Sequence, residues 1–312
     1  MAKNERDLPL LFRLWQYQKE RFSIVKHGLL IAAFSASAVC LSALLRGQTD
    51  FPGMGAFAVS FIVLFTLFFQ LRIADEFKDA EEDALYRPER AVPRGLISLR
   101  ELAGIGILTA ILQLMVVTSL SLSLLPILLM IWVYMSLMSA EFFAPAWLKA
   151  RPLLYMVSHM LIMPLIDLFA TACDWLVQEH HIPDGLIWFL IVSFFNGVII
   201  EIGRKTWAPS MERQGVETYS AAWGLKTALL AWMGAVVASL ICAVIVSFQT
   251  GFVIPAVSAL IILAALMART AWLLLKHQEP AHAKRLEDMS GLWLICIYLF
   301  LGIIPMGVSA WL

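Results

Sequence analysis

The sequence predicts an all-α, multi-pass membrane protein that forms a single domain of nine membrane-spanning helices. Three observations predict this class: the composition, the number of long apolar runs and the distribution of basic residues. Of the 312 residues, 61% are hydrophobic and 15% are charged, and the mean hydropathy is +0.80. Soluble domains carry roughly 45–50% apolar and about 25% charged residues. The composition therefore excludes a soluble enzyme, and the balance of 23 basic and 23 acidic residues indicates no nucleic-acid partner.

The segment 1–22 precedes the first apolar run and is too charged to be a cleaved signal peptide. Apolar side chains recur in it at roughly helical spacing: Leu8, Leu11, Trp15 and Phe22. We therefore expect this segment to form a short interfacial helix on the bilayer surface, with its basic side among the lipid headgroups.

Nine apolar runs have about the 20 residues that a helix needs to cross a bilayer. They are 24–45, 54–74, 102–121, 123–143, 153–173, 185–203, 224–247, 252–275 and 291–311. Strands are excluded for these runs because they are continuously apolar and about twice as long as a barrel strand. Each of the four cysteines falls inside a run, without a CxxC or Cys/His spacing, so we expect small hydrophobic residues rather than metal or redox ligands.

The basic residues orient the bundle, because cytoplasmic loops carry the excess of lysine and arginine. With nine spans, every lysine and arginine except Arg46 falls in the N-terminal segment or at a junction after an even-numbered span. The N-terminus is therefore expected in the cytoplasm and the C-terminus on the opposite side of a bacterial-type plasma membrane. The polar segments 75–100 and 204–222 become cytoplasmic loops, and function is expected there.

The first of these loops is rich in carboxylates, with seven acidic residues between positions 75 and 89. Asp75, Asp79 and Asp83 are spaced i, i+4, i+8, which places them on one face if the second spanning helix continues out of the bilayer. Like charges at this spacing destabilise a helix unless a cation compensates them. Mg²⁺ suits this set, since it takes oxygen ligands, keeps waters and binds substrate phosphates.

Nearby basic side chains, Lys78, Arg90 and Arg94, could hold the remaining phosphate charge. The alternative is a solvated charged face whose acids pair with Arg87, Arg90 and Arg94. The position favours function, because the acids lie at the end of an apolar helix beside the bundle interior.

This segment resembles the first signature of the UbiA-type intramembrane prenyltransferases, N/D-x-x-x-D-x-x-x-D followed by an R-P-L-P-x-G-x-I-S-like stretch. Asp75, Asp79 and Asp83 occupy the acidic positions, with Asp75 where most members have Asn, and residues 90–98 occupy the second part. Nine helices with the N-terminus inside also match the family. The resemblance implies a bundle around a central cavity that is open to the cytoplasmic side.

The family's second signature is an aspartate-rich motif after the sixth helix that ends in G-x-x-T. The stretch 215–218 fits this ending, but Trp207 and Met211 stand where the aspartates are usual. The nearest acids are Glu201 and Glu212, which we keep as candidate metal or diphosphate-shell residues.

Two basic residues follow the sixth run directly. Arg204 and Lys205 could neutralise phosphate charge where a second metal would otherwise do so. The alternative is a helix-end ion cluster in which Glu201 pairs with one of them.

Other polar residues lie in or beside the runs. The resemblance implies that a basic residue at the junction after the fourth run contacts the diphosphate, and Lys149 and Arg151 are the candidates. Asp167 falls in the middle of the fifth run, where a lone carboxylate is costly, so it should face the interior and find a partner. Asp167, His159 and Asn196 are candidate residues of the substrate pocket, and a structural, hydrogen-bonded acid is the alternative for Asp167. Glu141, near the cytoplasmic end of the fourth run, is an embedded acid with the same two interpretations as Asp167.

The residues and the resemblance together imply an enzyme that uses Mg²⁺ to transfer an isoprenyl group from an isoprenyl diphosphate to a lipophilic acceptor, an aromatic or quinone precursor. Asp75, Asp79 and Asp83 would hold the metal. A membrane-embedded terpene cyclase is one alternative, since the second motif is altered. A carrier in which Asp167 and Glu201 bind a transported ion is the other.

Overall fold

The computed structural model describes residue 5, residues 8–179 and residues 181–311, and in these the regular structure is entirely helical. Nine helical segments of this part are long and apolar enough to cross a membrane. They are α2 (Ile24–Leu45), α3 (Met54–Lys78), α5 (Leu99–Leu120), η2 and α6 (Leu122–Ser139), α8 and α9 (Pro152–Gln178), α10 (Leu186–Arg204), α12 (Leu225–Gln249), α13 (Val253–His277), and α14 and α15 (Pro280–Ser309). The predicted class and the number and order of the predicted spans are confirmed, but the fourth span ends at Ser139 rather than at residue 143.

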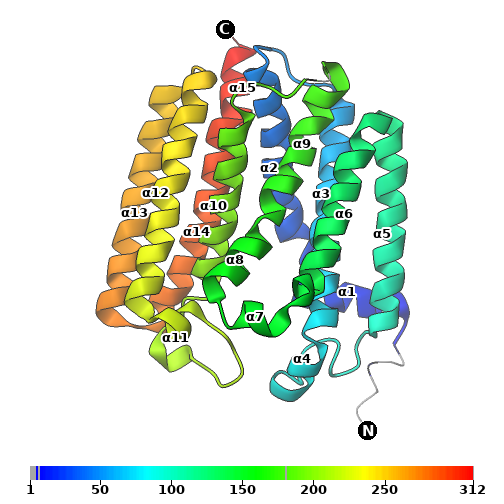
Figure 1. Cartoon of the computed structure of the whole chain (residues 1–312), viewed down its shortest axis with the longest axis vertical. Coiled ribbons are helices and arrows are strands. Elements are labelled where there is room, and N and C mark those ends of the chain that lie inside the picture. The colour runs from blue at the N-terminus through cyan, green and yellow to red at the C-terminus, as the bar shows by residue number, and fades with distance from the viewer. Residues whose placement is uncertain (1–4, 6–7, 180, 312) are drawn as a thin grey trace.

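Four short helices gather at one end of the bundle, which we call the polar-loop end (Figure 1). They are α1 (Leu10–Arg21), α4 (Ala80–Tyr86), α7 (Pro145–Lys149) and α11 (Tyr219–Trp223). The last helix, α15 (Ile303–Ser309), lies at the opposite end, as an odd number of spans requires. Both polar segments predicted to carry function therefore lie at the same end.

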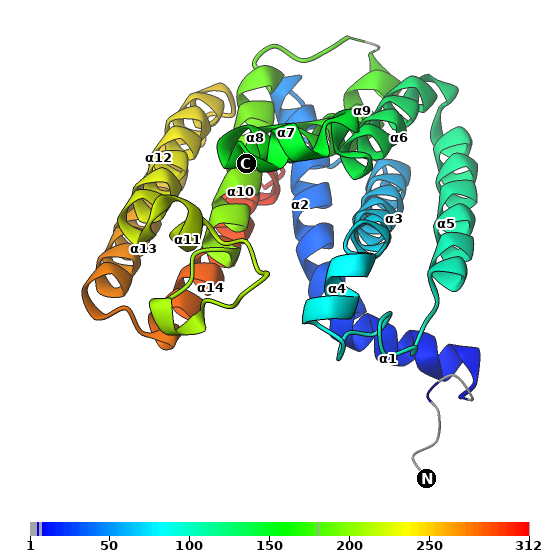
Figure 2. The same ribbon diagram turned by 60° about the horizontal axis from the view of Figure 1, so that its bottom comes forward.

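The spanning helices close a ring. In the order α2, α3, α5, α6, α9, α10, α12, α13 and α14, each contacts the next, and α14 contacts α2 again. Further contacts of α9 with α2 and α3, and of α10 with α14, cross the centre of the bundle. Figure 2 shows α5 on one side and the α12–α13 pair on the other, with α4, α7 and α11 between them.

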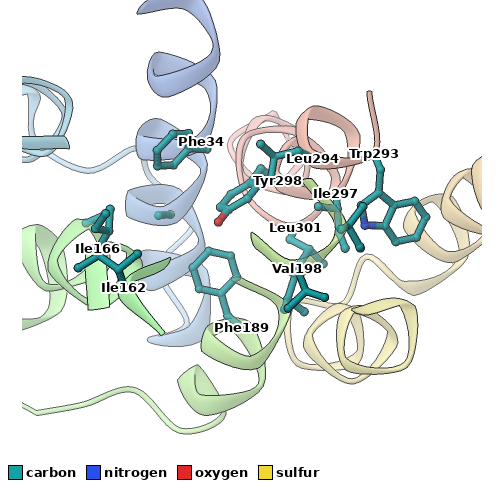
Figure 3. Close-up of a cluster of buried hydrophobic side chains, with 14 of the residues drawn as sticks. Phe34, Ile162, Ile166, Phe189, Val198, Trp293, Leu294, Ile297, Tyr298 and Leu301 are labelled. Atoms are coloured by element: carbon teal, nitrogen blue, oxygen red, sulfur yellow. The ribbon is translucent and has the colours of Figure 1, made fainter. Parts of the chain in front are cut away.

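Aromatic rings from distant segments pack in the buried centre. The Tyr298 ring of α14 lies 5.5 Å from the ring of Phe34 on α2 and 5.6 Å from that of Phe189 on α10 (Figure 3). Three of the four cysteines are buried and all four are free, as small hydrophobic residues would be.

Two spans contain a break, and the last begins earlier than predicted. The fifth is divided at Leu161 into α8 (Pro152–Met160) and α9 (Ile162–Gln178). The ninth is divided at Gly302, where a Cβ would lie 2.1 Å from the backbone oxygen of Ser37, so only glycine allows this approach of α14 to α2. Helix α14 begins at Pro280 rather than 291, because its first turns are polar and lie outside the apolar run.

Helix α1 lies across the polar-loop end (Figure 2). Its Leu11 and Trp15 side chains are exposed, whereas Tyr17 and the following Phe22 are buried against the bundle. An apolar outer face agrees with a helix at the bilayer surface, which stays a prediction. Residues 1–4 and 6–7 of the predicted interfacial segment lie outside the described residues.

Candidate active site

Helix α3 carries the first acidic group to the polar-loop end. Asp75 lies in its last turn, Asp79 joins α3 to α4, and Asp83 lies in α4. The Asp79 amide donates to the Asp75 backbone oxygen at 2.9 Å, and the Asp83 amide donates to that of Asp79 at 2.8 Å. The helical hydrogen-bond pattern therefore continues through the junction, as the spacing of the three aspartates predicts.

The three carboxylates differ in their partners. Asp75 is half exposed and forms a 2.9 Å ion pair with Arg72. Asp83 is buried and accepts hydrogen bonds from Arg87 at 2.9 Å and from Arg90 at 2.6 Å. Among the described residues, the Asp79 carboxylate has no hydrogen bond or ion pair. Burial, reinforced by the Asp75 charge, raises the pKa of Asp79.

This arrangement bears on the predicted metal ligands. Within the described ranges, no three His, Cys, Asp or Glu side chains are arranged to hold a metal ion. Mg²⁺ needs only one or two carboxylates together with waters and substrate phosphates. Asp75 and Asp79 fit that requirement, whereas Asp83 is engaged by arginines, as in the charged-face alternative.

The basic residues of this segment have defined partners. Lys78 donates to the Tyr155 hydroxyl and lies 3.1 Å from the Glu141 carboxylate. Arg94 forms 2.8 Å ion pairs with Glu5 and Glu20, so it ties α1 to the loop after α4. These ion pairs hold α1 in place, and the predicted role of Arg94 in binding a diphosphate stays a prediction.

The two basic residues after the fourth span point in different directions. Arg151 lies 4.5 Å above the Trp147 ring and donates to the Trp147 backbone oxygen at 3.1 Å. Lys149 is exposed at the end of α7, and the described residues offer it no ion pair. Lys149 is therefore the one of the two whose charge is available to a ligand.

The second polar segment begins with an ion cluster at the end of α10. Glu201 pairs with Arg204 at 2.7 Å and with Lys205 at 2.9 Å, which is the arrangement expected as the alternative. The Tyr86 ring at the end of α4 packs against Gly215 in the loop after α10, so the two polar segments are neighbours. The two motifs therefore meet at the polar-loop end.

Glu212 shapes the loop that follows. Its carboxylate accepts hydrogen bonds from the Thr218 hydroxyl at 2.7 and 2.8 Å and from the Ser220 hydroxyl at 2.6 Å. These bonds close the turn through Gly215, whose φ is +77°. Both carboxylate oxygens of Glu212 thus have a partner within the segment 212–220. Its role as a metal ligand stays a prediction.

The embedded candidates belong to two separate clusters. Asp167 is fully buried and accepts a hydrogen bond from the Tyr298 hydroxyl. Asn196, also buried, accepts from Ser239 at 3.2 Å. His159 instead stacks on Tyr155 at 4.0 Å, beside the polar-loop end. The structure therefore gives Asp167 the interior partner that was expected, but it does not bring Asp167 and His159 together.

Two tyrosines at this end have no counterpart in the sequence-based prediction. Tyr155 contacts Lys78 and Glu141, and Tyr86 packs against Gly215. Both contacts join segments far apart in the chain, and no local spacing indicates them.

Comparisons with known proteins agree with this architecture. The sequence model of the UbiA prenyltransferase family matches residues 34–297. A structure from work on digeranylgeranylglyceryl phosphate synthase in membranes superposes with a TM-score of 0.65 at 17% identity, covering 96% of this chain and 99% of that one. An apo structure of a UbiA homologue from Aeropyrum pernix K1 superposes with a TM-score of 0.70 at 13% identity, covering 90% and 98%. No curated protein matches the sequence.

Proposed function

Because the chain belongs to the UbiA prenyltransferase family, we propose that it transfers an isoprenyl group from an isoprenyl diphosphate to a lipophilic acceptor inside the membrane. The family and the nine spans make it an integral membrane prenyltransferase. The observation that carries the finer proposal is the Asp79 carboxylate, which has no side-chain partner among the described residues and lies beside Asp75 and Lys78.

The residues present fit a magnesium ion. Asp75 and Asp79 would supply its two protein oxygens, and the diphosphate and water would supply the others. When bound, Mg²⁺ would neutralise diphosphate charge and favour its departure. Asp83 would act indirectly, by holding Arg87 and Arg90 beside the site.

Basic side chains would receive the charge that grows on the leaving diphosphate. Lys149 has no ion pair in the described part, and Arg204 and Lys205 are partly exposed beside Glu201. Preorganised cations at such a position stabilise the transition state more than the ground state. The apolar interior would take the isoprenyl chain and keep water from the allylic cation.

The polar-loop end would face the cytoplasm, because it carries nearly all the lysine and arginine. An isoprenyl diphosphate would then enter from that side while its hydrocarbon chain lies among the spanning helices.

The test is an incubation of the purified, lipid-reconstituted protein with geranylgeranyl diphosphate and a lipid extract, with and without Mg²⁺. The proposal expects Mg²⁺-dependent pyrophosphate release and a prenylated lipid, both lost in Asp79→Asn but not in Asp288→Asn, a change at an exposed aspartate of α14. Pyrophosphate release with a cyclic hydrocarbon and no need for the extract would instead indicate a cyclase. Ion flux without pyrophosphate release would indicate a carrier.

A further inference from the structure

The chain turns sharply after α6 and thereby buries Glu141. Glu141, Phe142 and Phe143 have φ values of 47°, 52° and 58°, three consecutive non-glycine residues in the left-handed region. Each such residue is strained unless its surroundings hold it. The turn leaves Glu141 only 5% exposed, with its side chain against α8, while Phe143 faces outward.

One oxygen of Glu141 is satisfied and the other is not. Its Oε1 atom lies 3.1 Å from the Lys78 ammonium and 3.5 Å from the Tyr155 hydroxyl. Its Oε2 atom is buried and has no hydrogen-bond partner among the described residues. A buried carboxylate oxygen without a donor is costly, which indicates a missing partner.

His159, one turn after Tyr155, presents a second such atom. Its ring stacks on Tyr155 at 4.0 Å, and its Nδ1 atom lies 2.8 Å from the Tyr155 backbone oxygen. That oxygen only accepts, so Nδ1 carries the hydrogen, and the neutral ring has a bare Nε2 atom. Nε2 is also buried without a partner in the described chain. Both unsatisfied atoms are therefore hydrogen-bond acceptors.

The surroundings indicate what the missing donor is. Lys78 lies 3.1 Å from Glu141 and already balances its charge. An ionised carboxylate has no hydrogen to donate to these two acceptor atoms, and a cationic ligand would add an unbalanced charge. The Tyr155 ring, and the edge-on Phe142 ring 6.1 Å from His159, give the site aromatic walls. A neutral, hydroxylated ligand satisfies these conditions.

The site also lies next to the proposed chemistry. Lys78, which binds Glu141 and Tyr155, stands one residue before Asp79. A ligand held between Glu141 and His159 would therefore sit beside the diphosphate region rather than at the far end of the bundle.

We propose that Glu141 Oε2 and His159 Nε2 bind hydroxyl groups of the prenyl acceptor and so select a neutral, hydroxylated acceptor. This assignment rests on the proposed prenyl transfer. It concerns binding alone, so it can be tested without turnover.

The experiment uses the full-length protein in lipid nanodiscs with Mg²⁺ and pyrophosphate. Affinities are measured for four matched compounds: 4-propylbenzene-1,2-diol, 4-propylbenzene-1,3-diol, 4-propylphenol and 4-propylanisole. Because a hydrogen bond to a charged group is a strong one, we expect 4-propylphenol to bind at least about fivefold more tightly than 4-propylanisole. One of the two diols should bind more tightly again. Glu141→Gln, which replaces the acceptor Oε2 by a donor, and His159→Phe, which keeps the stacking, should each remove part of this preference. Glu287→Gln, at an exposed glutamate paired with Lys284, should leave it intact.

Equal binding of anisole and the hydroxylated compounds by the wild-type protein would overturn the assignment, as would an unchanged preference in both folded variants. If a variant fails to fold, the wild-type series decides alone. Mg²⁺-dependent binding of geranylgeranyl diphosphate is measured in parallel. If the wild-type protein does not bind geranylgeranyl diphosphate, the result counts against the proposed function. If it binds the diphosphate but shows no preference for hydroxylated compounds, the result counts only against the acceptor site.

Discussion

Gly215 lies directly against the ring of Tyr86: a Cβ at Gly215 would come within 2.9 Å of three ring atoms. The contact joins the loop after α10 to the end of α4, so the two polar segments of the site brace one another. Because Gly215 also has a φ of +77°, an alanine there meets both a strained backbone and a steric clash.

Gly215→Ala should therefore displace the loop and lower turnover, while the bundle stays folded. We expect a loss of kcat/KM of about tenfold or more and faster protease cleavage within 205–218, since misplacement near a site is costly. Gly234→Ala is the matched control, because nothing lies within 4 Å of its Cβ position on α12. Equal behaviour of the two variants would show that the Tyr86 contact does not position the site.

Asp79 and Asp83 should separate activity from stability. Asp79→Asn removes a carboxylate without a side-chain partner, so we expect turnover to fall at least about 100-fold with little change in melting temperature. Asp83→Asn breaks buried ion pairs with Arg87 and Arg90 and should cost up to about 3 kcal/mol of stability. Thermal unfolding in detergent and pyrophosphate release measure the two effects. If Asp79→Asn lost stability and Asp83→Asn lost only turnover, the difference in their side-chain partners would not explain their roles.

The fold could be predicted from the sequence because the bilayer imposes a length and a polarity on each span. The nine runs and the basic residues indicate the same topology independently. The start of α14 could not be predicted in this way, because Lys284 and Asp288 make its first turns polar although they are helical. Hydropathy detects the part of a helix inside the hydrocarbon and not its extension into water.

The site could be predicted only in part. The spacing of Asp75, Asp79 and Asp83 indicates their location, because it depends on local helix geometry. The partner of Arg94 could not be foreseen, since Glu20 lies far away in the sequence and only the docking of α1 brings it close. Likewise, nothing in Glu-Phe-Phe signals the left-handed turn at Glu141, where glycine would be the usual indication.

Helix α1 should depend on a buried ion pair with the helix that carries the aspartates. Arg21 lies 2.5 Å from Glu76, which is buried next to Asp75. Arg21→Gln leaves the Glu76 charge uncompensated, and such a loss typically costs about 3–5 kcal/mol. We expect faster amide hydrogen exchange in 10–21 and a lower melting temperature. A double variant with Glu76→Gln should recover part of the loss, and full additivity of the two changes would argue against a direct pair.

Acid should release α1 only at low pH. The hydrogen bond from Arg94 lowers the pKa of Glu20 in the folded protein. A depressed carboxyl pKa contributes stability that is present above the unfolded value, about 4.3, and is lost as the pH falls through the folded value. The protection factors of the amides in 10–21, which correct for the intrinsic pH dependence of exchange, should therefore be constant from about pH 8 to 5 and fall only below about pH 4. In Arg94→Gln the exchange should be faster throughout and this acid step should shrink, whereas an unchanged step would assign it to another carboxyl group.

Arg46, which lies at the end opposite the polar loops, should stabilise the fold without affecting the chemistry. Its guanidinium holds Asp174 at 2.9 and 3.1 Å, and Ser42 donates to the same carboxylate at 2.6 Å, so α2 and α9 are joined there. Arg46→Met leaves the buried Asp174 charge with one hydroxyl, at a typical cost of about 3–5 kcal/mol, whereas Arg285→Met at an exposed position should be nearly neutral. Adding Asp174→Leu to Arg46→Met removes the uncompensated charge and should restore part of the melting temperature.

The Mg²⁺ dependence and KM of all folded variants should match the wild type, because the pair lies across the bundle from the polar-loop end. A changed KM would show instead that the two ends of the bundle are coupled.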